Sequence, residues 1–102
     1  MSVKAIVPQF HRFIDPIFQA LKLLGGSGNN DEIYEKTIDT MHLSNEVIDI
    51  PHLNSSSQSE VQYRMAWART YLKKYGAIKN SARSIWSITP DYTTCKAIDS
   101  DA

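Results

Sequence analysis

Residues 57–88 read SQSEVQYRMAWARTYLKKYGAIKNSARSIWSI, and this stretch decides the fold. Apolar side chains recur through its first half at steps of three and four, the spacing of one helix face: Val61, Met65, Ala68, Leu72 and Tyr75. Ser57 with Glu60 forms a capping-box pair, and Ser59 with Gln62 offers the same pair in a second register. The sequence therefore predicts a helix that begins near these serines and ends at Gly76.

The pattern changes after this glycine. Residues 77–79 and 84–88 are two short extended runs rich in β-branched residues, and the polar residues 80–83 separate them. Such a pattern predicts a β-hairpin, which Thr89 and Pro90 end.

Helical spacing also runs from Phe10 to Leu24, interrupted by Asp15 and Pro16. Asp is a good N-cap and Pro suits the first helical position, so we expect a short turn before Asp15 and a helix over 16–24. The glycine-rich residues 25–28 are expected to form a loop that ends this helix.

Asn29 and Glu32 are expected to cap a second helix, whose apolar face comprises Tyr34, Ile38 and Met41 with Ile33 alongside. One more helical turn is expected at 44–47, then a connector at 50–53 and a polar loop at 54–57. Three helices followed by a hairpin is the element order of a winged helix-turn-helix. We therefore expect a mainly α fold with a small β-hairpin, a three-helix core plus a wing, over residues 1–90. Residues 91–102 are expected to be a disordered tail or the start of a linker.

Charge is balanced overall, with 11 Lys and Arg against 11 Asp and Glu, but it is divided along the chain. Residues 27–60 carry seven acids against Lys36 alone. Residues 61–88 carry no acid and six bases: Arg64, Arg69, Lys73, Lys74, Lys79 and Arg83. This division predicts a basic face for a polyanion, although an ordinary solvated basic helix has the same composition.

Several classes of protein are disfavoured. No apolar run approaches the length of a membrane span, and the N-terminus does not resemble a secretion signal. The single Cys95 allows no internal disulfide, which fits a reducing cytoplasm. Three scattered histidines give no ligand spacing, so we expect no metal or cofactor, and no nucleophile or phosphate-binding motif is present.

The segment Tyr63–Ile78, with its Trp-Ala-x-x-Tyr-Leu-Lys-Lys-x-Gly core, and the segment Arg83–Thr89 resemble the N-terminal domain of Mrr-like restriction endonucleases. The resemblance covers roughly residues 7–90. It implies a winged-helix domain that recognises duplex DNA, placed ahead of a PD-(D/E)xK nuclease domain that cuts foreign or modified DNA.

The chain departs from this pattern in two ways. Ser84 stands where the wing usually has glycine, which puts a positive-φ turn in doubt. The sequence contains no (D/E)-x-K triplet, so we expect no enzymatic activity from this chain. A nuclease domain in cis is then the expected partner if the chain is an excised domain, and a stand-alone relative is the alternative.

On the face of the predicted third helix opposite its apolar stripe, the N-terminal residues are candidates for reading bases: Ser59, Gln62, Tyr63 and Ala66. Candidates for holding phosphates follow on the helix and the wing, with Ser81 at the wing tip: Arg69, Lys73, Lys79, Ser81 and Arg83. Each of these assignments has an alternative. Tyr63 and Trp67 are also consistent with packing against the core. Arg64 could instead form an ion pair with an acid of the second helix, and Glu60 could serve as the helix cap.

Two other functions use the same fold. A protein-interaction module, including a homodimer, could dock a partner on the acidic second helix. A small transcriptional regulator would use the same DNA-binding face.

Overall fold

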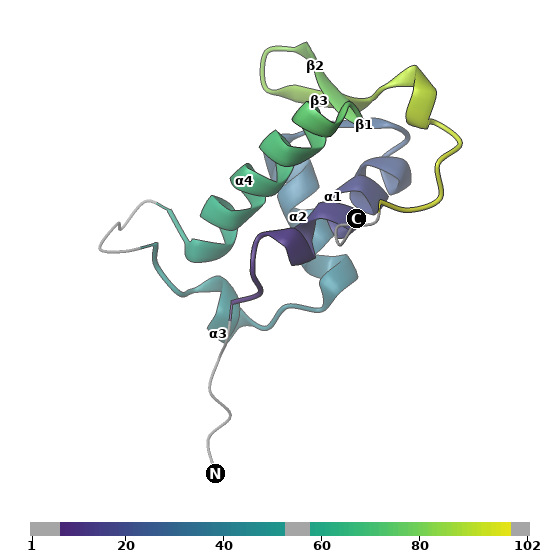
Figure 1. The fold of residues 1–102 in the computed structure, drawn as a ribbon. Coiled ribbons are helices and arrows are strands. Elements are labelled where there is room, and N and C mark those ends of the chain that lie inside the picture. Colours follow the sequence, from purple (N-terminus) through teal and green to yellow (C-terminus); the bar gives the residue numbers. More distant parts are fainter. Residues whose placement is uncertain (1–6, 53–57, 99–102) are drawn as a thin grey trace.

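The computed structural model describes residues 7–52 and 58–98. The elements in chain order are α1 (His11–Leu23), β1 (Ser27–Asn29), α2 (Asn30–Met41), α3 (Asn45–Ile48), α4 (Glu60–Tyr75), β2 (Ile78–Ala82), β3 (Ile85–Ile88) and the 3-10 helix η1 (Pro90–Tyr92). The sheet lies at one end of the helices, beyond the C-terminal end of α4 (Figure 1). The fold is thus mainly helical with a small three-stranded antiparallel sheet, which is compatible with the predicted winged helix.

Helix α1 is continuous, so the predicted break at Asp15 is wrong. Pro16 lies inside the helix and costs one backbone hydrogen bond. The helix tolerates this loss because one face is fully buried in the core: Phe13, Ile14, Ile17, Phe18, Ala20 and Leu21. Asp15 does not act as an N-cap, and its carboxylate accepts hydrogen bonds from Gln19 Nε2 and from the backbone N–H of Ile98.

Helices α2 and α4 both pack against α1. The predicted stripe on α4 is confirmed from Val61 to Leu72, since all four of its side chains there are buried, whereas Tyr75 is exposed. On α2 the predicted Ile33 is buried, together with Thr37, which the prediction did not include. Tyr34, Ile38 and Met41 are only partly buried.

The helix caps follow the sequence closely. The Asn29–Glu32 capping box of α2 and the short helix α3, capped by Ser44, are both confirmed. Of the two registers predicted for α4, the structure uses Ser59 and Gln62. Ser57 and the polar loop predicted at 54–57 lie outside the described residues.

The glycine-rich segment after α1 contains a strand that the sequence did not predict. Strand β1 pairs antiparallel with β3, and Gly28 lies opposite Trp86. A Cβ on Gly28 would lie 2.9 Å from Leu24 Cδ1, so a larger residue there would displace the end of the Leu24 side chain. The strand was missed because it exists only through pairing with residues nearly sixty positions away.

The predicted hairpin is confirmed, with a different turn. Strand β2 extends to Ala82 with a register irregularity at Ser81, and Arg83 and Ser84 make the turn. Ser84 has a φ of 62°, so the positive-φ turn that the missing glycine put in doubt is present nevertheless. A left-handed conformation costs an L-residue about 1–2 kcal/mol.

We expect Ser84→Gly to raise the free energy of unfolding by about 0.5–1 kcal/mol, because relief of this strain exceeds the extra chain entropy of glycine. Thermal denaturation should show a melting temperature higher by a few degrees. Arg83→Gly is the matched control, because Arg83 has no positive φ. A destabilised Ser84→Gly variant would contradict the assigned strain.

The segment after the hairpin, described up to Ile98, packs against the helical core. Ile98 is 5% exposed and belongs to the core cluster. Gln19 Nε2 donates to Lys96 O at 2.7 Å, and Lys22 Nζ donates to Cys95 O at 2.8 Å. The segment therefore covers α1. The division into a domain over 1–90 and a tail over 91–102 stays a prediction.

Candidate nucleic-acid interface

The N-terminal end of α4 is held by a network of charged groups. Glu60 accepts hydrogen bonds from Arg64 Nε and pairs with His52 Nδ1, both at 2.7 Å. Arg64 Nη1 also donates to the carbonyl oxygens of Val7 and Pro8, each at 2.9 Å. Arg64 thus pairs within its own helix, and the predicted ion pair with the second helix is wrong. The network orients α4 relative to the connector and the N-terminal segment.

The hydrogen bonds from His52 and Arg64 hold the pKa of Glu60 below its ordinary value near 4.5. A depressed carboxyl pKa adds stability above the unfolded-state value, and this stability is lost as the pH falls through the folded-state value. Glu60→Gln should therefore destabilise the protein at pH 7, and the difference from wild type should shrink below about pH 4.5. Urea denaturation across this range measures it; a difference independent of pH would contradict the network.

Three of the four candidates for base reading make contacts within the chain. The Ser59 hydroxyl accepts from the backbone N–H of Gln62. The Tyr63 ring is stacked on His52 with 3.6 Å between centroids, which supports the packing alternative for this residue. Gln62 is exposed although its Oε1 accepts from the Ser59 N–H, and Ala66 is partly buried.

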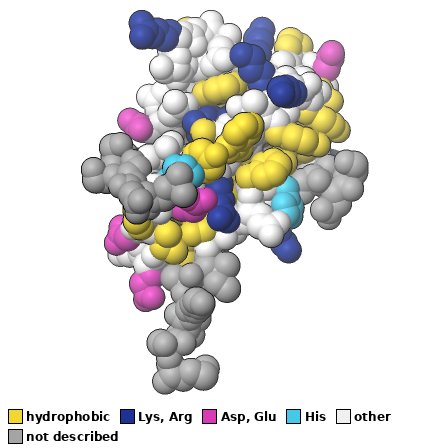
Figure 2. Space-filling model, turned by 60° about the vertical axis from the view of Figure 1, so that its left-hand side comes forward, with side chains coloured by type: hydrophobic (Ala, Val, Ile, Leu, Met, Phe, Trp, Pro, Cys, Tyr) yellow, Lys and Arg dark blue, Asp and Glu magenta, His cyan; other side chains and the backbone are white. Residues whose placement is uncertain are grey.

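Three of the predicted phosphate-binding side chains are exposed at one end of the molecule: Lys73, Lys79 and Arg83. They belong to the last turn of α4 and to the hairpin, and Lys73 Nζ lies 3.4 Å from Asn80 Oδ1 of β2. In Figure 2 several Lys and Arg side chains lie over the upper part of the molecule, and most Asp and Glu lie to the left and below. We define the exposed side chains Lys73, Lys79 and Arg83 as the basic end.

Ser81 does not lie at the wing tip. It belongs to β2, and its hydroxyl accepts from Ser87 Oγ at 2.8 Å, so it braces the hairpin from within. The prediction misplaced it because the turn was expected at 80–83, whereas β2 continues to Ala82.

Arg69 also departs from its predicted place on the solvent-facing side of α4. Its guanidinium lies 5.9 Å from the ring centroid of Trp86 and lines a groove beside α2. Burial lowers its pKa from the ordinary value, although an arginine stays charged at neutral pH. Trp86 is in turn held by a hydrogen bond from Nε1 to Asn30 Oδ1 at 2.8 Å. Arg69 is thus directed inward and is not part of the basic end.

The sequence profile of the Mrr N-terminal domain matches residues 10–93, most of the chain. The chain belongs to the Mrr N-terminal domain family. This places it among domains associated with restriction systems. No curated protein and no solved structure matches it. In this Mrr N-terminal domain, none of the described helices is long and apolar enough to cross a membrane.

Four residues that the sequence analysis did not propose as site residues line the groove between α2 and α4: Asn30, Asp31, Tyr34 and Gln58. On the other flank of α4 an aromatic patch, defined as Phe10, Tyr63 and Trp67, includes two strongly exposed rings, with Phe10 41% and Trp67 53% exposed. The groove and the aromatic patch each combine residues from separate elements, so the spacing of residues along one element does not predict them.

Proposed function

We propose that this Mrr N-terminal domain is a winged-helix module that binds duplex DNA. In this proposal α4 enters the major groove, and the hairpin of β2 and β3 is the wing that touches the adjacent backbone. The observation that carries the proposal is the basic end, where Lys73, Lys79 and Arg83 lie exposed on these two elements. Cations on a helix and a neighbouring hairpin suit the phosphates that flank one groove.

The proposed readers of sequence lie nearer the start of α4. Gln62 is exposed, and its amide nitrogen, which has no partner among the described residues, suits the N7 acceptor of adenine. Ala66 offers a methyl group for a thymine or another base methyl. Ser59 and Tyr63 are assigned to positioning this end of the helix, because their polar atom and ring are already engaged.

Family membership supports a biological setting as well. We propose that the module is the recognition part of an Mrr-like restriction endonuclease acting on foreign or modified DNA, with the nuclease residues outside this chain. A small transcriptional regulator would use the same surface. Binding to matched methylated and unmodified duplexes, compared by electrophoretic mobility, tests the preference for modification.

Binding to a duplex of about 20 base pairs, followed by fluorescence anisotropy across a salt series, tests the proposal. Three phosphate contacts predict that log affinity falls against log salt with a slope of about −2.7, at roughly 0.9 per contact. Affinity should therefore fall about 40-fold between 50 and 200 mM salt. No binding at low salt, or an affinity that ignores salt, would refute DNA binding.

The aromatic patch supports a second candidate, a protein-interaction module. Exposed aromatic rings are enriched at protein interfaces, and Tyr63 and Trp67 meet edge to face with 6.4 Å between centroids. This candidate places the partner on the patch and not on the acidic helix expected from the sequence. Light scattering distinguishes the two functions: a stable dimer that ignores DNA and is lost in Trp67→Ala favours protein interaction.

A further inference from the structure

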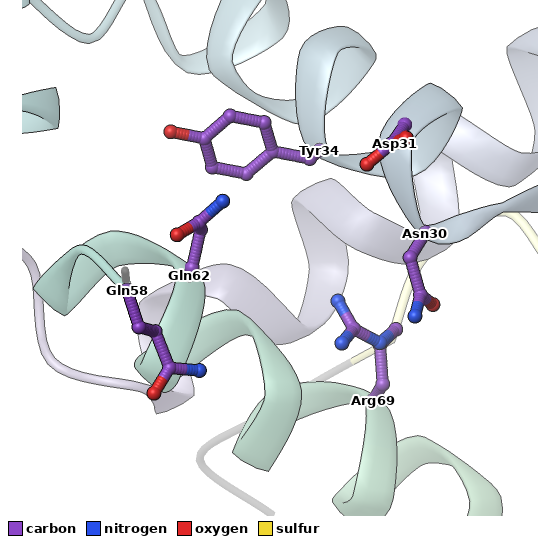
Figure 3. Close-up of a pocket in the computed structure, with 6 residues that line it drawn as sticks. All are labelled: Asn30, Asp31, Tyr34, Gln58, Gln62 and Arg69. Atoms are coloured by element: carbon purple, nitrogen blue, oxygen red, sulfur yellow. The ribbon is translucent and has the colours of Figure 1, made fainter. Parts of the chain in front are cut away.

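A polar groove separates α2 from the first half of α4. Both helices pack on α1, and the space between them is a cavity of about 290 Å³. Six polar side chains line it (Figure 3): Asn30, Asp31, Tyr34, Gln58, Gln62 and Arg69. Tyr34 and Gln62 lie toward one end, and Arg69 lies with Asn30 toward the other.

Several polar atoms of this groove have unused hydrogen-bonding capacity. Arg69 Nε is buried and has no hydrogen-bond partner among the described residues. Asn30 and Gln62 use their amide oxygens within the chain, for Trp86 Nε1 and the Ser59 N–H. Their amide nitrogens have no partner within residues 7–52 and 58–98. Arg69 Nε is the buried donor among these three, and a buried donor left without an acceptor is costly, so an acceptor from a ligand would stabilise the site.

The charges of the groove narrow the class of ligand. Arg69 contributes one positive charge and Asp31 one negative charge, so the lining is neutral overall. A phosphate would be repelled by Asp31, and an apolar side chain would leave the guanidinium and the amides without partners. The lining suits a neutral group that presents both acceptors, for Arg69 and the amide nitrogens, and donors, for the carboxylate.

We propose that this groove binds a nucleobase. A base is neutral and planar and carries donors and acceptors on its edges. The volume lies near the lower end of the roughly 300–1,000 Å³ of ligand pockets, which suits one ring system and not an oligonucleotide. Tyr34 supplies an aromatic face for stacking. Arg69 is pre-positioned over Trp86 to donate to the base.

The base has two possible sources. One is a nucleotide turned out of bound DNA, and this version rests on the proposed function, since α4 would carry the groove to the duplex. The other is a free nucleoside. Turning out a base costs a few kcal/mol of unstacking and pairing, and the cost is least for a base that is already unpaired.

The experiment compares two 20-base-pair duplexes that differ by one unpaired, bulged base, with each of the four bases in turn. We expect wild type to bind at least one bulged duplex about tenfold or more tightly than the paired duplex. Asp31→Asn and Tyr34→Ala should each remove this preference and leave binding to the paired duplex within about twofold, because neither residue belongs to the basic end. Asp39→Asn, on the exposed C-terminal part of α2, is the charge-matched control and should keep the preference.

A second arm adds adenosine, cytidine, guanosine or thymidine to the ¹⁵N-labelled protein. NMR then follows the chemical shifts of the backbone amides of Gln62 and Arg69. Shifts that are lost in Asp31→Asn, without any preference for a bulge, identify a free nucleoside as the ligand. A bulge preference that depends on Asp31 identifies the DNA base.

The proposal is overturned if paired and bulged duplexes bind equally and no nucleoside shifts these signals; salt-dependent duplex binding would then leave the proposed function standing. A bulge preference that survives in both Asp31→Asn and Tyr34→Ala also overturns it, because it would then come from DNA bending. If no duplex binds, the proposed function fails and the nucleoside arm alone decides about the groove.

Discussion

Replacing Lys73, Lys79 and Arg83 together by alanine is expected to lower duplex affinity by several-hundredfold at 0.1 M salt. Each phosphate contact contributes about 0.9 to the slope of log affinity against log salt, so three contacts contribute about a factor of 500 at this concentration. The three side chains are exposed and lie on the last turn of α4 and the hairpin. Fluorescence anisotropy of the triple variant should also show a slope close to zero.

A matched control separates a specific surface from net charge. Replacing Arg12, Lys36 and Lys96 by alanine also removes three positive charges. These residues lie on α1, on α2 and after η1. This control should change affinity by less than about threefold, since none of the three residues belongs to the basic end and charges more than about 10 Å away are screened at this ionic strength. Equal losses in the two triple variants would show that total charge governs binding and would refute the basic end as the contact surface.

Ile98→Ala is expected to destabilise the protein by about 2–4 kcal/mol, the range for truncating a buried aliphatic side chain. Ile98 packs into the core cluster, and its N–H donates to Asp15 Oδ1 at 2.8 Å. The melting temperature in a thermal scan should fall by roughly 10 °C or more. The backbone hydrogen bond is kept in this variant, so the loss measures the packing of the side chain.

Lys96→Ala is the control two residues away. Its side chain is exposed, and its contact with Gln19 is made by the backbone carbonyl, which the substitution retains. Stability should change by less than about 0.5 kcal/mol. If Ile98→Ala were as mild as Lys96→Ala, the docking of this segment would contribute nothing to the fold.

The helices were predictable because their signals are local. The step of three and four from Val61 to Leu72, the Asn29–Glu32 box and Gly76 all act within one or two turns of the chain. The break predicted at Pro16 was wrong because the sequence shows the loss of one backbone hydrogen bond. It does not show the burial in the whole core that offsets this loss. On α2 the prediction missed Thr37, which is buried beside Ile33 because α2 packs against α1.

The candidate site was predicted in part. Exposed cations on α4 and the hairpin followed from composition and spacing, and the structure gathers three of them at the basic end. Helical geometry alone did not predict the contact of Arg69 with Trp86, because Trp86 lies beside Arg69 only once β3 is paired into the sheet. Tyr63 likewise meets His52 only because residues 50–52 return beside the start of α4.

By itself the sequence determined helix α4, the caps of α2, α3 and α4, the hairpin and the family, since each depends on residues a few positions apart or on a continuous motif. The tertiary structure decided the pairing of β1 with β3, the docking of Ile98, the inward turn of Arg69 and the groove beside it. These features join segments far apart along the chain, and contacts of that kind form only once burial of the common core has brought the segments together.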